Sequence, residues 1–267
     1  MNHLLREHAP ISAAGWQLLD EEARQRATPA LAARRLVDFS GPHGWEYSAT
    51  NLGRTRRTAA TPVEGVTGLQ RVSLSLVELR ADFEVSRAEL RDADRGAGDT
   101  DLASLDRAAH QLAVAENVAV FHGWKGVIAG ISEASPHAKG KPGAAADGYP
   151  RLAAQAVEQL LGTGVGGPYG LALGREQYRV VVETSEHGGY PLLEHLGKIL
   201  GGPIVWAPGV DGAVVLSLRG GDFVFECGQD LSIGYDSHDA EVVRLYLEET
   251  FSFHVATPEA AVALTTS

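Results

Sequence analysis

The stretch Asp236-Ser-His-Asp239 holds the three side-chain types of a hydrolytic triad: a hydroxyl nucleophile, an imidazole base and a carboxylate that orients the base. A working triad needs these groups to converge in space. Side chains that follow one another along the chain do not usually reach that geometry. The stretch therefore predicts a polar turn rather than an active site.

The single cysteine, Cys227, is another candidate nucleophile. It shares its alternation with Phe223 and Phe225, on the apolar side of an expected strand, where a cysteine behaves as a small hydrophobic residue. We therefore expect no catalysis at this thiol. One cysteine also forms no intrachain disulfide and no multi-thiolate zinc site, which fits a reducing compartment.

The glycine-rich run Gly162-Thr-Gly-Val-Gly-Gly167 is similar to a nucleotide-binding loop. Such a loop needs a strand before it and a helix after it, because the phosphate binds at the helix amino terminus. In this sequence a helical pattern comes first and the apparent strand from Tyr169 to Leu173 follows. The run therefore predicts a plain turn between a helix and a strand.

Ten histidines are present, but they are scattered along the chain. The step from His187 to His195 is not the three or four residues that place two metal ligands on one helix face. We predict no metal site and no catalytic residues.

Composition restricts the class of protein. The chain has 267 residues, of which 44% are hydrophobic and 21% charged, as in ordinary globular proteins. Its formal net charge of -11 repels a phosphate backbone, so nucleic acid is not an expected partner. No apolar run is long enough to cross a membrane and the amino terminus does not resemble a secretory signal, so we expect a cytoplasmic protein.

The first two thirds of the chain alternate between helical and extended patterns. Apolar residues recur at helical spacing from Trp16 to about Val37, with Ser12 as the expected cap, and Pro29 should split this helix near Thr28. A strand or hairpin arm is expected from Arg71 to Phe83.

The longest helical pattern ends at Phe121, with Asp99 or Thr100 as its expected cap. Another helix is expected from Leu152 to Leu161, and a subdomain boundary near residue 130.

The last third is rich in strands. Alternate residues from Val243 to Val255 are apolar, and only Glu249 breaks the alternation of apolar and polar positions. A strand of this length needs partner strands and a covered face, so we predict that it lies at the centre of an α+β domain.

Several sequence blocks together resemble family 1 encapsulins, the bacterial nanocompartment shell proteins also known under linocin-type bacteriocin names. The blocks occur in order over nearly the whole chain. They are Arg6-Glu-His-Ala-Pro-Ile-Ser12 ahead of Trp16, Gly41-Pro-His-Gly-Trp-Glu-Tyr47, Glu78-Leu-Arg-Ala-Asp-Phe83, Gly167-Pro-Tyr-Gly170, His187-Gly-Gly-Tyr-Pro191, Arg219-Gly-Gly-Asp-Phe223, Gly228-Gln-Asp-Leu-Ser-Ile-Gly-Tyr235 and Val243-Arg-Leu-Tyr-Leu-Glu-Glu-Thr-Phe251.

This resemblance implies an HK97-like capsid fold and a homo-oligomer, a T=1 icosahedral shell of about 60 copies. The chain would then divide into an N-terminal inner-wall helical segment (1–40), mainly an extended E-loop (41–80), a P-domain with a long spine helix (81–130), an A-domain (131–214) and the return strands of the P-domain (215–267). We expect the arm to contact a neighbouring subunit, because an isolated two-stranded hairpin is only marginally stable.

The resemblance also implies a cargo enzyme, either a dye-decolorising peroxidase or a ferritin-like protein, held inside the shell by its C-terminal targeting peptide. By position, Ala27, Leu31, Asp38, Ile233 and Tyr235 are the candidate peptide contacts. The apolar side chains would bury the hydrophobic residues of the peptide, and Asp38 would meet a basic residue or a backbone amide.

The loop residues Glu186, His187, Gly188, Gly189 and Tyr190 match the region that rings the five-fold pore in this family. The resemblance therefore implies that they gate small solutes.

Some family members bind a flavin on a tryptophan just after the arm. Ala88 stands at the matching position here, so we predict no cofactor.

Two alternatives to the shell protein stay open at this point. The first is a phage-type major capsid protein of the same fold, which would be distinguished by the contents of the particle. The second is a soluble hydrolase or a bacteriocin, suggested by the family's older names and by the residues around Ser237 and His238.

Overall fold

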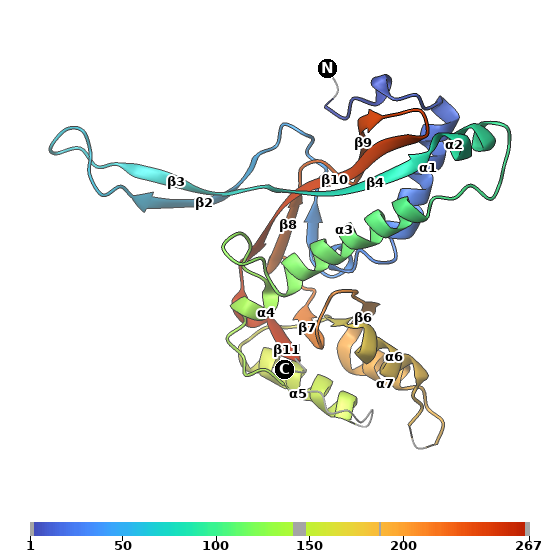
Figure 1. Ribbon diagram of the computed structural model, residues 1–267. Helices are drawn as coiled ribbons and strands as arrows, with labels where there is room; N and C mark the ends of the chain where they lie inside the picture. The colour runs from blue at the N-terminus through green and yellow to red at the C-terminus, as the bar shows by residue number, and fades with distance from the viewer. Residues whose placement is uncertain (1–2, 141–147, 187, 265–267) are drawn as a thin grey trace.

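The computed structural model describes residues 3–140, 148–186 and 188–264. Figure 1 shows two packed parts, one around a long sheet and the helix α3 and one around a smaller sheet with α5, α6 and α7, and an arm that extends away from both. The helices are η1 (Arg6–His8), α1 (Ala13–Ala27), η2 (Ala33–Arg35), α2 (Arg87–Asp94), α3 (Ala103–Phe121), α4 (Ile131–Ala134), α5 (Tyr149–Gly162), α6 (Arg175–Glu183), α7 (Leu192–Leu200) and η4 (Pro258–Ala260). The strands are β1 (Asp38–Ser40), β2 (Ala49–Arg57), β3 (Leu69–Ser75), β4 (Val77–Ser86), β5 (Tyr169–Leu173), β6 (Gly201–Trp206), β7 (Ala213–Ser217), β8 (Phe223–Cys227), β9 (Ser232–His238), β10 (Val242–Val255) and β11 (Ala261–Leu264).

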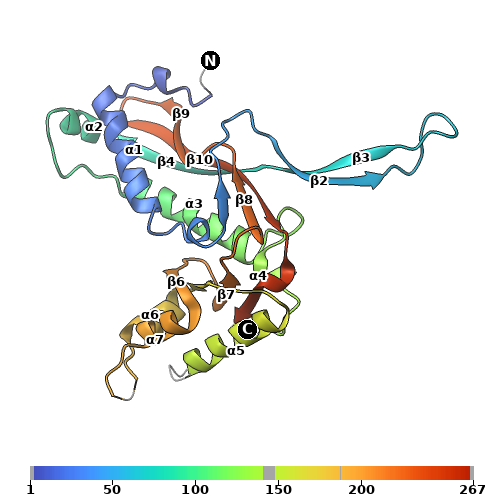
Figure 2. The same cartoon turned by 180° about the vertical axis from the view of Figure 1, so that it is seen from behind.

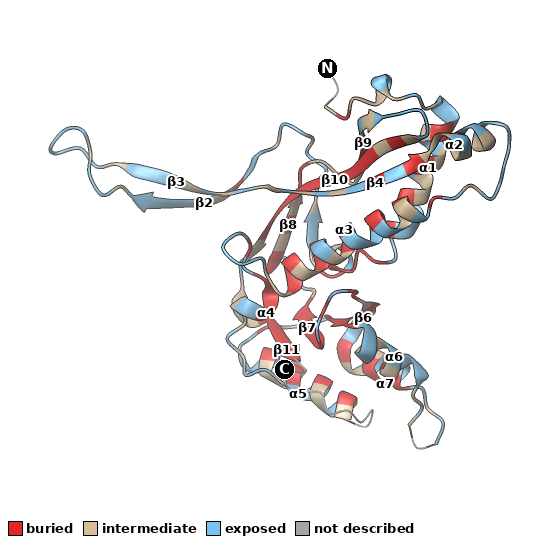
Figure 3. Ribbon diagram, in the orientation of Figure 1, coloured by how far each residue is buried: buried red, intermediate tan, exposed pale blue. Residues whose placement is uncertain are grey.

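The strand β10 is the centre of the first sheet, as its alternation predicts. It pairs along most of its length with β4, and its other edge pairs first with β9 and then with β8, beyond which β1 completes the sheet. Residues of both alternations are buried in the middle of β10, including Glu248 and Glu249 (Figure 3). The polar alternation therefore marks buried polar contacts here, not a face exposed to water.

The helix α3 packs against β4 and β10, and α1 packs against α3 and contacts β9. Its apolar stripe, which includes Leu105, Ala109 and Leu112, is fully buried in the core beneath the sheet. The predicted cap was wrong: neither Asp99 nor Thr100 caps the helix, which begins at Ala103 after Leu102. The Asp101 carboxylate instead accepts the Ala103 N–H at 3.0 Å.

Pro29 splits the N-terminal helical pattern, as expected. The helix α1 begins after Ser12, whose hydroxyl oxygen accepts the Gly15 N–H at 2.9 Å, and ends at Ala27. The helix does not continue beyond Pro29, because proline has no N–H for the next helical hydrogen bond. The chain forms only the short turn η2 before β1 begins.

The second sheet has the order β11-β7-β5-β6. Its inner strand β5 is buried throughout and belongs to a hydrophobic core that includes residues of α5, α6 and α7 and extends to residues of β8 and β10. The helix expected from Leu152 begins three residues earlier, at Tyr149, and ends at Gly162. The glycine-rich run after it is a turn into β5, with Gly164 at φ +79°, so the prediction of a plain turn is confirmed.

The arm consists of β2 and β3, paired antiparallel and extending away from both packed parts (Figures 1 and 2). The extended pattern from Arg71 to Phe83 breaks at Leu76, because β3 pairs with β2 in the arm whereas β4 pairs with β10 in the sheet. Most of the arm is exposed, including large apolar side chains near its tip.

Candidate functional site

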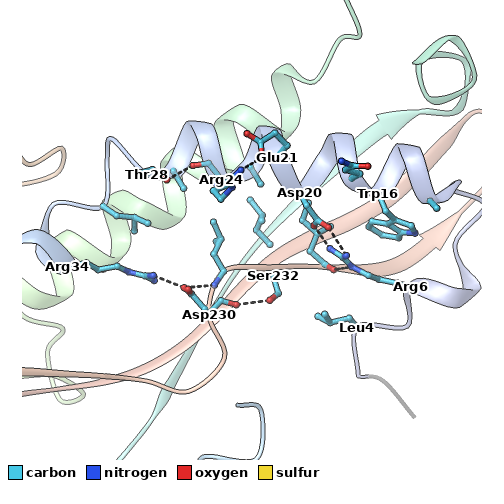
Figure 4. Close-up of a pocket in the computed structure, with 18 residues that line it drawn as sticks. Leu4, Arg6, Trp16, Asp20, Glu21, Arg24, Thr28, Arg34, Asp230 and Ser232 are labelled. Atoms are coloured by element: carbon cyan, nitrogen blue, oxygen red, sulfur yellow. Dashed lines mark hydrogen bonds and ion pairs between the residues drawn. The ribbon is translucent and has the colours of Figure 1, made fainter. Parts of the chain in front are cut away.

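A groove of about 980 Å³ lies between the N-terminal segment, α1 and the strands β9 and β10 (Figure 4). Its walls combine an apolar set with a charged set. The apolar lining residues are Leu4, Ala13, Trp16, Ala23, Ala27, Leu31, Leu231, Ile233 and Leu247. The polar and charged lining residues are Arg6, Gln17, Asp20, Glu21, Arg24, Thr28, Arg34, Asp230 and Ser232.

Three of the five residues expected to contact a peptide meet in this groove. Ala27 and Leu31 come from the end of α1 and the segment after it, and Ile233 comes from β9. All three are buried among apolar neighbours, so they form the floor of the groove.

The other two expected contacts do not line the groove. The Asp38 carboxylate accepts the Gly221 N–H at 2.8 Å at the start of β1. The Tyr235 hydroxyl forms a hydrogen bond with Nδ1 of His238 at 2.6 Å, and the Tyr235 N–H donates to the Leu4 carbonyl oxygen at 2.8 Å.

The charged lining residues form ion pairs. Arg6 binds Asp20 with two hydrogen bonds, one of them from Nη1 at 2.9 Å, and its guanidinium lies 4.4 Å from the centre of the Trp16 ring. Its Nε also donates to the Ile233 carbonyl oxygen at 2.8 Å. Arg24 pairs with Glu21.

Arg34 and Asp230 lie at the opposite end of the groove from Arg6 and Trp16 (Figure 4). Arg34 donates from Nη1 to Asp230 at 2.6 Å and from Nε to Glu116 at 2.7 Å, and Nη2 binds Glu249. Burial lowers the pKa of Arg34, but the three carboxylates outweigh this effect and the pKa lies above its ordinary value. Arg34 is therefore a permanent cation.

The sequence alone did not identify Arg6, Trp16, Asp20 or Arg34 as lining residues. Arg6 and Trp16 stand in a block that carries the family resemblance, but no periodic pattern connects the first 34 residues with residues 230–233. The groove forms only through the tertiary packing of these distant segments.

The expected pore residues lie on the connection between α6 and α7. Gly188 and Gly189 have φ of +97° and +80°, and the Glu186 N–H donates to the Tyr190 carbonyl oxygen at 2.8 Å, which closes the turn. The Glu186 carboxylate is 2.8 Å from Nδ1 of His195. His187 lies outside the described residues.

The predicted turn at Asp236-Ser-His-Asp239 was wrong, because β9 continues to His238 to pair with β10. Successive strand residues point to opposite faces, and the Ser237 hydroxyl donates to Asp236 while the His238 ring binds Tyr235. Hence Ser237 and His238 do not have the contacts of a nucleophile and its base.

Cys227 is fully buried, and burial raises the pKa of its thiol to about 12. This thiol is therefore not an activated nucleophile. Within the described ranges, no three His, Cys, Asp or Glu side chains are grouped closely enough to hold a metal ion. In the same part of the chain no helix has the length and apolar character to span a membrane.

Comparison with known proteins identifies the family to which the chain belongs. Residues 1–252 match the model of the family described as encapsulating protein for peroxidase. The type 1 encapsulin shell protein of Rhodospirillum rubrum is 48% identical, covering 99% of this chain and 96% of that protein. The type 1 encapsulin shell protein of Rhodococcus erythropolis is 43% identical, covering 99% of this chain and all of that protein.

Solved structures show the same fold. A virus-like particle from Pyrococcus furiosus aligns with a TM-score of 0.67 at 18% identity, covering 93% of this chain and 98% of that chain. The capsid of Myoviridae phage XM1 aligns with a TM-score of 0.56 at 10% identity, covering 89% and 92%. The HK97-like capsid fold predicted from the sequence is therefore confirmed. Because phage capsids share this fold, it is the sequence relatives that decide between the alternatives: the chain belongs to the type 1 encapsulin shell proteins, which are structural, self-assembling proteins.

Proposed function

We propose that the groove binds the C-terminal targeting peptide of a cargo enzyme and so holds this enzyme inside the shell. The observation that carries the proposal is the convergence of Ala27, Leu31 and Ile233 on one floor. The volume of the groove is at the upper end of the range of about 300–1,000 Å³ for ligand sites, which suits several residues of an extended peptide.

The strand β9 offers little backbone for the peptide. Backbone groups on its outer edge already have partners within the chain. The Ile233 carbonyl oxygen accepts a hydrogen bond from Arg6, and the Tyr235 N–H donates to the Leu4 carbonyl oxygen. The peptide is therefore recognised through its side chains, which contact the apolar floor of the groove, and not by pairing as an additional strand with the edge of β9. Asp38 and Tyr235 are proposed contacts for parts of the peptide that extend beyond the groove.

The cargo that we propose first is a peroxidase of the dye-decolorising class, because the matching family is described as encapsulating protein for peroxidase. A ferritin-like protein is the second proposed cargo. In the same proposal the chain forms a cytoplasmic T=1 shell of about 60 copies, and the loop from Glu186 to Tyr190 rings its five-fold pore.

The experiment compares two identical substitutions on α1. Gln17 and Gln25 are both exposed, but only Gln17 lines the groove. Each Gln→Trp variant is co-expressed with a peroxidase that carries its own targeting peptide, and the enzyme that elutes with purified particles is quantified. We expect Gln17→Trp to reduce loading about tenfold or more, equivalent to 1.4 kcal/mol of lost binding, and Gln25→Trp to load normally. Equal loading of both variants would contradict the proposal.

A further inference from the structure

Four charged groups from separate parts of the chain meet behind the Arg34 end of the groove. Arg34 comes from η2, Glu116 from α3, Asp230 from the connection between β8 and β9, and Glu249 from β10. The Glu116 and Glu249 side chains are only 0% and 1% exposed, whereas Asp230 is 44% exposed. Glu116 and Glu249 are therefore cut off from solvent, and of the three carboxylates only Asp230 reaches water.

The charges in this cluster do not balance if all three carboxyl groups are ionised. One guanidinium then faces three carboxylates, which leaves a net charge of -2 in a nearly dry environment. Arg34 satisfies one oxygen of each buried glutamate, but Oε1 of Glu116 and Oε1 of Glu249 are buried and have no hydrogen-bond donor. Two unsatisfied buried acceptors beside an excess charge are costly.

One proton resolves both problems. We propose that Glu116 and Glu249 share a proton, and that this proton makes the cluster a pH-sensitive lock on the Arg34 end of the groove. The proton reduces the net charge of the cluster to -1. It also turns one carboxyl into a donor for the other, as in carboxyl pairs that are too close for both to ionise.

The surroundings of the pair support this assignment. Burial raises the pKa of Glu249, and the negative charge of Glu116 raises it further; burial also raises the pKa of Glu116. The other groups that face the pair are Arg34, Asp230 and Cys227. Asp230 opposes ionisation, Arg34 favours it but is shared by three carboxyl groups, and the Cys227 thiol is neutral.

Loss of the proton acts on the groove through Asp230. At high pH the buried pair carries two charges, so three anions compete for Arg34 and the least buried one, Asp230, is released most easily into water. Asp230 also accepts the Leu231 N–H at 2.8 Å, so its release frees this part of the groove wall. An effect on bound peptide rests on the proposed function, whereas the shared proton and the lock do not.

Infrared spectroscopy of the intact shell tests the shared proton. The carbonyl stretch of a protonated carboxyl group is recorded against pH in the wild type and in Glu116→Gln, Glu249→Gln and Glu226→Gln. Glu226 is the control because its carboxylate binds His43 at a partly exposed site. We expect a protonated-carboxyl band at neutral pH that is lost in the first two variants and kept in the control. Absence of the band from the wild type at neutral pH overturns the proposal, as does a band unchanged in both of the first two variants.

Hydrogen exchange tests the lock without any peptide. Protection factors of the amides around Leu231 are measured as the pH rises in the wild type and in Glu249→Gln, whose amide replaces the proton as donor. We expect protection in the wild type to fall by up to tenfold per pH unit, the limit for release of one proton, and to change little in the variant. The same pH trend in both proteins overturns the lock. If both tests succeed and no targeting peptide binds at any pH, the proposed function fails while this inference stands.

Discussion

The buried side chain of Asn117 accepts the backbone N–H of Ala32 at 3.0 Å, directly beyond the point at which Pro29 ends the first helical segment. Its Oδ1 also accepts the Ala33 N–H at 3.0 Å, and its Nδ2 donates to the carbonyl oxygens of Ala30 and Pro208 at 2.8 and 3.1 Å. A side chain of α3 thus supplies hydrogen bonds to the backbone just after the point where Pro29 interrupts the helical hydrogen bonds. This contact fixes the segment that carries Leu31 and Arg34 into the groove.

Asn117→Ala should therefore destabilise the subunit strongly. The Ala32 N–H and the Ala30 carbonyl oxygen keep their hydrogen bond to each other at 2.9 Å, but the substitution removes the Asn117 partner of the buried Ala33 N–H and Pro208 carbonyl oxygen. Each buried group left unsatisfied costs about 1–3 kcal/mol, so we expect the free energy of unfolding to fall by at least about 2 kcal/mol, measured by urea denaturation. Arg107→Gln, at an exposed position of the same helix, should cost less than about 0.5 kcal/mol. Similar midpoints for the two variants would show that Asn117 does not organise this segment.

Local patterns predicted the elements better than their contacts. The alternation from Val243 to Val255 identified β10, and Pro29 marked the end of α1, because both signals depend on neighbouring residues. No local pattern indicates that Arg34 meets Glu116 and Glu249, more than 80 residues away. All five candidate peptide contacts were placed by family position, and the structure brings Ala27, Leu31 and Ile233 together in the groove, whereas Asp38 and Tyr235 do not line it.

Gly234 lies where β9 crosses the Tyr246 ring of β10. A Cβ at Gly234 would lie 2.1 Å from Cζ of Tyr246, far inside contact distance. Gly234→Ala must displace this ring and should cost about 1–3 kcal/mol. Gly197→Ala is the matched control, because it lies within α7 with open space around it, and should instead stabilise by about 0.5–1 kcal/mol. Urea midpoints that shift in the same direction for both would contradict this account.

Asp239 makes the stability of the turn between β9 and β10 depend on pH. The N–H groups of Glu241 and Val242, together with Arg244, lower the pKa of the Asp239 carboxyl to about 2 from its ordinary value of 3.8. Because the folded pKa is depressed, this stabilisation is present above the ordinary pKa and is lost as the pH falls towards 2.

We expect Asp239→Asn to melt at a lower temperature than the wild type at about pH 6, and the two melting temperatures to converge near pH 2. Asp99→Asn, at an exposed position, should follow the wild type throughout. A constant difference between the wild type and Asp239→Asn across this range would mean that charge at Asp239 does not stabilise the turn.

The arm carries surface that the single subunit leaves unpaired. Val63 and Val66 at its tip are 62% and 59% exposed. From residue 49 to residue 75 the arm has four arginines and one glutamate, a net charge of +3. Because the whole chain has a formal net charge of -11, the remainder of the chain carries -14. An apolar tip on a basic stem is therefore complementary to other, acidic copies of this chain, and we predict that a neighbouring subunit covers it in the shell.

Val66→Asp tests this contact against Thr67→Asp, the same charge at the adjacent exposed polar position. Neither change alters the core, so circular dichroism and the free energy of unfolding of dissociated subunits should match the wild type. Burying a valine side chain stabilises a contact by about 1.5 kcal/mol or more, and the loss is repeated in every copy of the shell. We expect Val66→Asp to require at least about tenfold more protein before light scattering and electron microscopy detect particles. Thr67→Asp should assemble close to the wild-type concentration, since no apolar contact is lost. Particles of Val66→Asp that form at the wild-type concentration would show that the tip stays exposed to solvent in the shell.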